Sequence, residues 1–220
     1  MWQGTFERGL VMKLVKSILL TGSILSVLAL PMAGGVGVAL AENLLSNPGF
    51  ETGDLTGWLV FGQSPNSSVT VLTGDNGPSA PGTHNAFLDN QGEALALVLK
   101  QSTPAGSGIP GPVLYSFDLK LDQADVGGVL FVNIFAEQAN GGVIGGSGLM
   151  GPFWPWNGWT TYSGSFQAPA NTDFLTIQIE AVTGANVDSS CRAHADNVVL
   201  DQGTVAAEEM SWGGIKSLYR

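Results

Sequence analysis

Short runs of β-branched and aromatic residues, separated by turn-forming residues, recur along most of this chain. Residues 115–121 alternate strictly between apolar and polar side chains, which is the pattern of a strand with one buried and one wet face. Helical periodicity is scarce, and 31 glycines interrupt the runs. Many short strands between turns are typical of a sandwich or a barrel. The sequence therefore predicts an all-β fold, a two-sheet antiparallel β-sandwich.

Nine strands are expected, near residues 57–62, 68–72, 86–88, 94–99, 115–121, 129–137, 159–167, 174–182 and 195–200. The run 94–99 is apolar at both its odd and its even positions, so we expect this strand in the middle of the sandwich, covered on both faces. The stretches 103–112 and 141–158 are rich in glycine and proline. They are predicted to be surface loops rather than domain boundaries.

The first 41 residues have the order of a signal peptide. Lys13 and Lys16 precede a 13-residue apolar run, 18–30, and small residues then lead to an A-x-A site that ends at Ala41. A membrane-spanning helix needs roughly 20 continuous apolar residues, so we expect cleavage after Ala41 rather than a retained anchor. The signal peptide starts either at the first residue or at Met12. The mature protein is then secreted or held at the cell surface, and it does not span a membrane.

The expected mature chain, residues 42–220, is strongly acidic. It keeps 5 of the 8 basic residues and 17 of the 18 acidic ones, which gives a net charge of −12. Between residues 43 and 202 the basic side chains are only Lys100, Lys120 and Arg192, so no basic patch is available to bind a phosphate backbone. Nucleic-acid binding is excluded on this ground.

Residues suited to catalysis are few. Cys191 is the single cysteine, so an internal disulfide is excluded; it is either a small buried apolar residue or an intermolecular or reactive thiol. His84 and His194 are the only histidines, and neither G-x-S-x-G nor H-E-x-x-H occurs. Glu137 and Glu180 could serve as the carboxylate pair of a glycoside hydrolase, but sheet packing explains them equally well. We predict that the protein is not an enzyme.

Four motifs follow one another along the chain. They are NLLSNPGFE at 43–51 with Gly-Trp at 57–58, GTHNAFLDNQGEALALVLKQ at 82–101, GWTTYSGSF at 158–166 and ADNV at 195–198. In this order they resemble the galactose-binding-like jelly rolls that include carbohydrate-binding module families 4, 9, 16 and 22. The resemblance implies a jelly roll over residues 42–202 whose partner is a polysaccharide or oligosaccharide.

The same resemblance implies a structural calcium ion. Glu51 and Asp196 would supply carboxylate oxygens, which are the hard ligands that calcium prefers. Backbone carbonyls that complete the shell in the family correspond here to Gly53 and to His84 or Asn85. Such an ion would clamp the two chain ends of the domain together. The alternative is that Glu51 and Asp196 are ordinary capping or salt-bridged carboxylates.

The first candidate binding surface is one face of a sheet. The runs 129–137 and 174–182 alternate between an apolar set and a set that mixes aromatic and polar side chains. Sugar binding needs aromatic planes and hydrogen-bonding groups, and in the resembled families a concave sheet face binds the glycan, with help from a polar residue of the penultimate strand. The alternative is a plain amphipathic sheet. The predicted contacts are Phe131, Asn133, Phe135, Glu137, Gln178 and Glu180.

The second candidate surface is the loop GPFWPWNG at 151–158. Large apolar side chains gain free energy by burial, so Phe153, Trp154 and Trp156 either fold back on the sheet edge or meet a ligand. Trp58 and Trp159 each follow a glycine at the start of a strand, where the resembled family has packing positions. They are predicted to lie in the core.

The last segment departs from the strand pattern. Residues 203–209 resemble a linker, and 210–220 place apolar residues at helical spacing, which predicts a short amphipathic tail. This tail either packs loosely on the sandwich or docks to cell-envelope components. We thus predict a non-catalytic extracellular carbohydrate-binding protein. The alternative is a structural or adhesive cell-envelope protein with the same fold and no glycan ligand.

Overall fold

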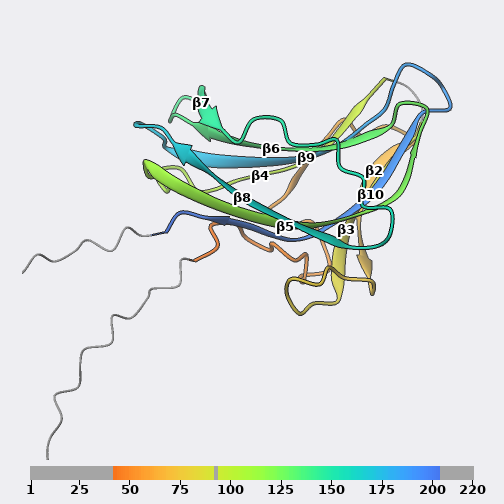
Figure 1. Ribbon diagram of the computed structural model, residues 1–220, viewed down its shortest axis with the longest axis horizontal. Coiled ribbons are helices and arrows are strands. Elements are labelled where there is room, and N and C mark those ends of the chain that lie inside the picture. Colours follow the sequence, from red (N-terminus) through yellow and green to blue (C-terminus); the bar gives the residue numbers. More distant parts are fainter. Residues whose placement is uncertain (1–41, 92–93, 204–220) are drawn as a thin grey trace, which may run out of the picture. The chain divides into compact units, whose positions relative to one another are not determined.

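The computed structural model describes residues 42–91 and 94–203; the expected signal peptide and the amphipathic tail lie outside them. Within these residues ten strands form two five-stranded sheets, and no helix occurs that could cross a bilayer. Figure 1 shows the sheets as two layers, with β4, β6 and β9 in one and β3, β5 and β10 in the other. The predicted two-sheet antiparallel β-sandwich is confirmed.

Sheet A has the strand order β1-β4-β9-β6-β7, and sheet B has the order β2-β3-β10-β5-β8. All neighbouring strands are antiparallel. Sheet A consists of β1 (Leu59–Phe61), β4 (Ala96–Ser102), β9 (Phe174–Val182), β6 (Val129–Glu137) and β7 (Val143–Gly146). Sheet B consists of β2 (Ser67–Thr73), β3 (His84–Gln91), β10 (Ser190–Asp201), β5 (Gly111–Asp125) and β8 (Thr160–Ala168).

The core is built from the inward positions of alternating strands, as the sequence predicts. β6 and β9 each direct three large aliphatic side chains inward, and full burial of such a side chain contributes about 1.5–3 kcal/mol. Opposite them β5 contributes an aromatic ring and aliphatic groups. The fully buried members are Leu130, Val132, Ile134, Leu175, Ile177, Ile179, Phe117 and Leu119.

β10 lies at the centre of sheet B, between β3 and β5. Its Cys191 is fully buried, and burial raises the pKa of the thiol to about 12. A thiol in this state is neither nucleophilic nor available to a partner. Of the two interpretations of Cys191, the small buried residue is therefore the correct one.

Two predictions about elements are wrong. The run 94–99 was expected in the middle of the sandwich, but β4 lies beside the edge strand β1, with Ala96 exposed and Val98 half-buried. The alternate apolar side chains of β4, Ala96 and Val98, lie on the outer face of sheet A, which carries apolar as well as polar groups. β7 was expected to be loop, because Val143–Gly146 is short and half glycine.

The first motif joins the two chain ends of the domain. The backbone N–H of Leu44 donates to the carbonyl of Leu200 at 2.8 Å, and that of Val198 donates to the carbonyl of Pro48 at 2.9 Å. Phe50 is fully buried, and its ring centroid lies 5.3 Å from that of Trp58. The prediction that Trp58 belongs to the core is confirmed.

Candidate functional site

The outer face of sheet A brings together the predicted contacts of β6 and β9. In the register of the two strands, Phe131 lies opposite Glu180, and Asn133 lies opposite Gln178. Phe135 follows in the next row, and all five side chains are half-buried. The face is therefore one continuous surface of aromatic and hydrogen-bonding groups.

The same rows continue onto β4 and β1. Lys100 lies opposite Gln178 and Val98 opposite Glu180, and on the edge strand Phe61 lies opposite Val98. Phe61 is 51% exposed. The sequence analysis missed these three side chains. Their signal is the period-2 alternation of residues 59–61 and 96–102, which locates them on this face only once the strand order is known.

An open hollow of about 230 Å³ lies on this face. It is lined by Phe61, Val98, Lys100 and Gln178. An aromatic ring and an aliphatic side chain supply apolar walls, while an ammonium and an amide supply hydrogen bonds. Small-molecule sites are usually lined in this way, by apolar walls with a few convergent polar groups.

The acidic side chains of the face differ in how much they offer a ligand. Burial raises the pKa of Glu180, and a hydrogen bond with Asn133 opposes this shift. Glu137 is buried, with 8% of its surface exposed, so it presents less to a ligand than its neighbours on β6 do.

Glu137 and Glu180 also lie far apart. Glu180 is opposite Phe131, six residues along β6 from Glu137, which corresponds to roughly 20 Å at the rise of a strand. Glycosidase carboxylates lie about 5–9.5 Å apart. These two side chains therefore do not form a hydrolytic acid pair.

Within the aromatic loop 151–158, one aromatic side chain folds back on the sandwich and two are exposed, so each of the two interpretations holds for part of the loop. Phe153 folds back, with its ring centroid 4.5 Å from that of Tyr162. Trp154 and Trp156 are each 47% exposed, and their rings stack with centroids 6.2 Å apart and planes at 16°. The backbone N–H of Leu121 on β5 donates to the carbonyl of Pro155 at 3.1 Å, which fixes the middle of the loop.

The start of this loop adjoins the face of sheet A. The N–H of Phe153 donates to the carbonyl of Leu130 on β6 at 2.9 Å. A Cβ added at Gly151 would come within 3.0 Å of the Phe131 ring. The loop therefore begins against an aromatic side chain of the candidate face.

Trp159 does not lie in the core, contrary to the sequence prediction. It is half-buried, its indole N–H donates to Asp75 Oδ1 at 3.0 Å, and its ring stands edge-on to His194 at 5.9 Å. His194 is buried beneath it, with Nε2 2.8 Å from Asp122 Oδ2. His194 lies opposite Lys120 on the neighbouring strand of sheet B, and Lys120 pairs with both aspartates. Trp159 therefore covers a network of polar side chains on the outer face of that sheet.

The two predicted calcium carboxylates meet at Gly49. A Cβ there would lie 3.5 Å from Asp196 Oδ1 and 3.7 Å from Glu51 Cγ. Burial raises the pKa of Asp196 to about 6, and the negative charges of Asp118 and Glu51 add to this effect. A cation beside Asp196 would offset this repulsion, so the carboxylates suit a hard ion.

Of the backbone carbonyls predicted to bind calcium, that of His84 is better placed than that of Asn85. The N–H of His84 donates to Glu51 Oε1 at 2.9 Å. Because the N–H and C=O of one strand residue point to the same side, the carbonyl of His84 shares the side of Glu51, whereas that of Asn85 turns toward β2. Gly53 lies beside the His84 ring, 3.6 Å from Nε2 to a Cβ built at the glycine.

Carboxylates and histidines alone do not make a metal centre here. Across residues 42–91 and 94–203, no group of three or more His, Cys, Asp or Glu side chains is arranged to hold a metal ion. A calcium site at Gly49 would therefore need backbone carbonyls as well as Glu51 and Asp196.

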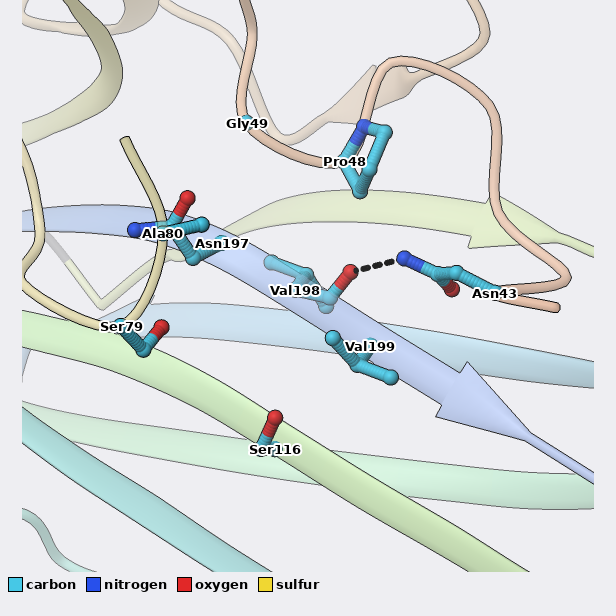
Figure 2. Close-up of a pocket in the computed structure, with 9 residues that line it drawn as sticks. All are labelled: Asn43, Pro48, Gly49, Ser79, Ala80, Ser116, Asn197, Val198 and Val199. Atoms are coloured by element: carbon cyan, nitrogen blue, oxygen red, sulfur yellow. Dashed lines mark hydrogen bonds between the residues drawn. The ribbon is translucent and has the colours of Figure 1, made fainter. Parts of the chain in front are cut away.

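A second hollow, of about 220 Å³, lies next to this pair of carboxylates. Figure 2 shows Asn43 and Pro48 on one side of β10 and Ser79 on the other, with Asn43 donating to the Val198 carbonyl at 2.9 Å. Gly49 and Asn197 belong to both the hollow and the surroundings of Asp196. Its lining is Asn43, Pro48, Gly49, Ser79, Ala80, Ser116, Asn197, Val198 and Val199.

Comparisons with known proteins give similarity in structure. No protein-family model matches the sequence, and neither does any curated protein. The enzymatically active domain of bacteriophage CBA120 tailspike protein 4 has a TM-score of 0.56 at 13% identity, over 72% of this chain and 21% of that chain. The arabinose-bound α-L-arabinofuranosidase MgGH51 has a TM-score of 0.50 at 12% identity, over 75% of this chain and 27% of that chain. The shared feature is the fold.

Carbohydrate-binding modules are among the similar structures. TmCBM61 in complex with β-1,4-galactotriose has a TM-score of 0.49 at 19% identity, over 74% of this chain and 99% of that chain. This is the class of module that the four sequence motifs resemble. The chain spans about a fifth of the tailspike and about a quarter of the arabinofuranosidase.

Proposed function

We propose that the protein is a non-catalytic, extracellular carbohydrate-binding protein that holds a polysaccharide or oligosaccharide on the outer face of sheet A. One observation carries the proposal: the hollow in which Phe61 and Val98 face Lys100 and Gln178. The similarly folded α-L-arabinofuranosidase, whose structure is arabinose-bound, supports a sugar ligand.

Each part of the face has a chemical role in this proposal. Phe61 offers its ring to the apolar C–H face of a sugar, and Phe131 offers a second ring on the far side of the row. Gln178 and Asn133 bind hydroxyl groups, since an amide both donates and accepts. Glu180 accepts a hydrogen bond when ionised and donates one when protonated.

The stacked Trp154 and Trp156 would extend the binding surface beyond the sheet. Exposed aromatic rings cost free energy in water, which a ligand that covers them recovers. The loop begins against Phe131, so a glycan that leaves the face at β6 reaches the loop next.

A calcium ion at Gly49 belongs to the same proposal as a structural element. Glu51 and Asp196 would hold it with their carboxylates, assisted by the carbonyls of His84 and Gly53. The ion would neutralise the buried charge of Asp196 and the exposed charge of Glu51, and it would join the first motif to β10. It has no part in binding the glycan.

A glycan array probed with the purified domain tests the function. We expect saturable binding, and we expect Phe61→Ala to weaken it about two- to tenfold, since an aromatic contact contributes on the order of 0.5–1.5 kcal/mol. Leu114→Ala is the matched control, because Leu114 is also 51% exposed but lies on β5 in sheet B. Equal loss in both variants would remove the role of the sheet A face.

Absence of glycan binding, together with surface retention that depends on residues 203–220, would instead favour the structural or adhesive protein. Hydrolysis of any glycan in the array would refute the non-catalytic part of the proposal. N-terminal sequencing of the exported protein checks the expected cleavage after Ala41.

A further inference from the structure

Lys100 is the only basic side chain of residues 42–91 and 94–203 that has no carboxylate partner. Lys120 pairs with two aspartates, including Asp122 at 3.3 Å, and Arg192 pairs with Asp89 at 3.2 Å. No carboxylate oxygen in the described chain comes within 4.0 Å of the Lys100 ammonium. In a protein with 18 acidic and 8 basic residues, an unpaired cation does not arise from a shortage of partners.

The position of this cation connects it to the proposed glycan face. Lys100 lies in the row between Leu59 and Gln178, and it lines the hollow together with Phe61. The nearest acidic residue in the strand register is Glu180, one row away. Glu180 is engaged with Asn133, and its burial disfavours the ionised form. The positive charge of Lys100 is therefore left available to a ligand in the hollow.

We infer that the glycan held on this face carries an anionic substituent, a carboxylate or a sulfate, which pairs with Lys100. The inference rests on the proposed function and specifies its ligand class. A charge-assisted hydrogen bond is roughly twice as strong as one between neutral groups. An anionic sugar therefore gains more from Lys100 than a neutral sugar does.

The net charge of the protein opposes anionic ligands at long range, but not at contact. Screening at physiological salt limits such repulsion to a Debye length of about 8 Å. Within the hollow the closest charge is the Lys100 ammonium itself. Acidic and neutral glycans are thus distinguished by this contact and not by the overall field of the protein.

The test uses matched pairs of glycans that differ only in charge. The probes are oligogalacturonate against its full methyl ester, and a sulfated galactan oligomer against its desulfated form, measured by titration calorimetry at physiological salt. We expect one anionic member to bind about tenfold more tightly than its neutral form, consistent with one desolvated charge-assisted contact. Whichever pair shows the larger preference identifies the carboxylate or the sulfate as the recognised group.

Three variants test whether Lys100 causes this preference. Lys100→Gln should abolish the preference by weakening the anionic member far more than the neutral member, while Lys100→Arg should retain it. Lys120→Gln removes the same charge from sheet B and should leave the preference intact, with melting temperatures as a check on folding. Equal affinity for both members of each pair, or a preference that survives in Lys100→Gln, overturns the inference and leaves the proposed function standing. Binding to no glycan at all overturns both.

Discussion

At the scale of single residues, Trp154 and Trp156 are the side chains whose exposure is hardest to explain without a ligand. Trp154→Ala and Trp156→Ala should each weaken glycan binding about five- to tenfold, because a stacked aromatic ring contributes on the order of 1 kcal/mol or more. Isothermal titration with the best-binding glycan of the array measures this. Phe153→Ala is the contrasting variant, since its ring packs against Tyr162.

Phe153→Ala should mainly lower the free energy of unfolding, by about 1–3 kcal/mol, which is less than the about 3–5 kcal/mol of a fully buried phenylalanine because Phe153 is half-buried. Chemical denaturation measures this change. Unaltered affinity in both tryptophan variants would show that the loop lies outside the glycan site.

His194 gives a prediction for pH. Burial lowers its pKa below the ordinary 6.5, although the hydrogen bond with Asp122 opposes the shift. The folded state therefore stays neutral where the unfolded chain takes up a proton, and the contribution of His194 to stability is lost as the pH falls below about 6.5.

The melting temperature of the wild type should thus fall more steeply between about pH 7 and pH 5 than that of His194→Gln. The comparison isolates His194, because Asp196, whose pKa of about 6 lies in the same range, is present in both proteins. Parallel pH profiles for the two proteins would contradict this role.

How much of the site could be predicted from sequence depends on which residue is considered. Phe131, Asn133 and Gln178 were predictable because a period of two assigns every second residue of a strand to one face. Phe61 and Lys100 were not, since their place on this face depends on β1 and β4 being neighbours of β9. Trp159 was placed wrongly because its Gly-Trp pair resembles that of Trp58. Trp159, just before β8, instead lies on the outer face of sheet B, next to His194.

At the scale of elements, the connection between β2 and β3 is held to sheet B by buried carboxylates. The N–H of Gly77 donates to Asp196 Oδ2 at 2.7 Å, and Ser79 Oγ donates to Asp118 Oδ2 at 2.7 Å. A Cβ at Gly77 would approach Asp118 Oδ2 to 2.4 Å. This connection therefore has room only for glycine at position 77.

Gly77→Ala should destabilise the domain by about 1–3 kcal/mol, as overpacking does elsewhere. A change of 1 kcal/mol corresponds to a fall in melting temperature of about 2–4 °C in a protein of this size. Gly203→Ala is the control, because a Cβ there meets no atom within 4 Å. Equal melting temperatures for Gly77→Ala and the wild type would show that the connection moves away from Asp118 at little cost.

Most elements could be predicted because their alternation survives in the sequence. The bounds expected for β6 and β9 coincide with those observed, since both strands have one aliphatic and one mixed face. β4 was misplaced because apolar residues at alternate positions look the same in one sequence whether they face outward or are covered by a second layer. β7 was missed because two of its four residues are glycines, which carry no pattern.

At the scale of the whole molecule, the proposed calcium ion links the first motif to the last strand. Ionised Asp196 is costly in the folded state, as its pKa of about 6 indicates, and a bound cation removes that cost. A ligand that binds only the folded state adds about 2.7 kcal/mol at 100 times its Kd. We therefore expect calcium to raise the melting temperature and a chelator to lower it.

Asp196→Asn should remove most of this response to calcium, measured by scanning calorimetry. Asp188→Asn, in an exposed turn, should keep the full response. A wild-type transition that responds neither to calcium nor to chelator would leave Glu51 and Asp196 as capping carboxylates, the alternative that the sequence also allowed.

The joined chain ends have a mechanical consequence. Leu44 bonds to Leu200 and Pro48 to Val198, so the first motif runs antiparallel to β10, and both ends of the domain leave from the same place. Tension applied between residues 42 and 203 falls on these bonds one after another, beginning with the outermost, as in opening a zipper. A domain loaded in this geometry yields at a low force, whereas a load applied between one end and a ligand on sheet A has to be carried across the strands together.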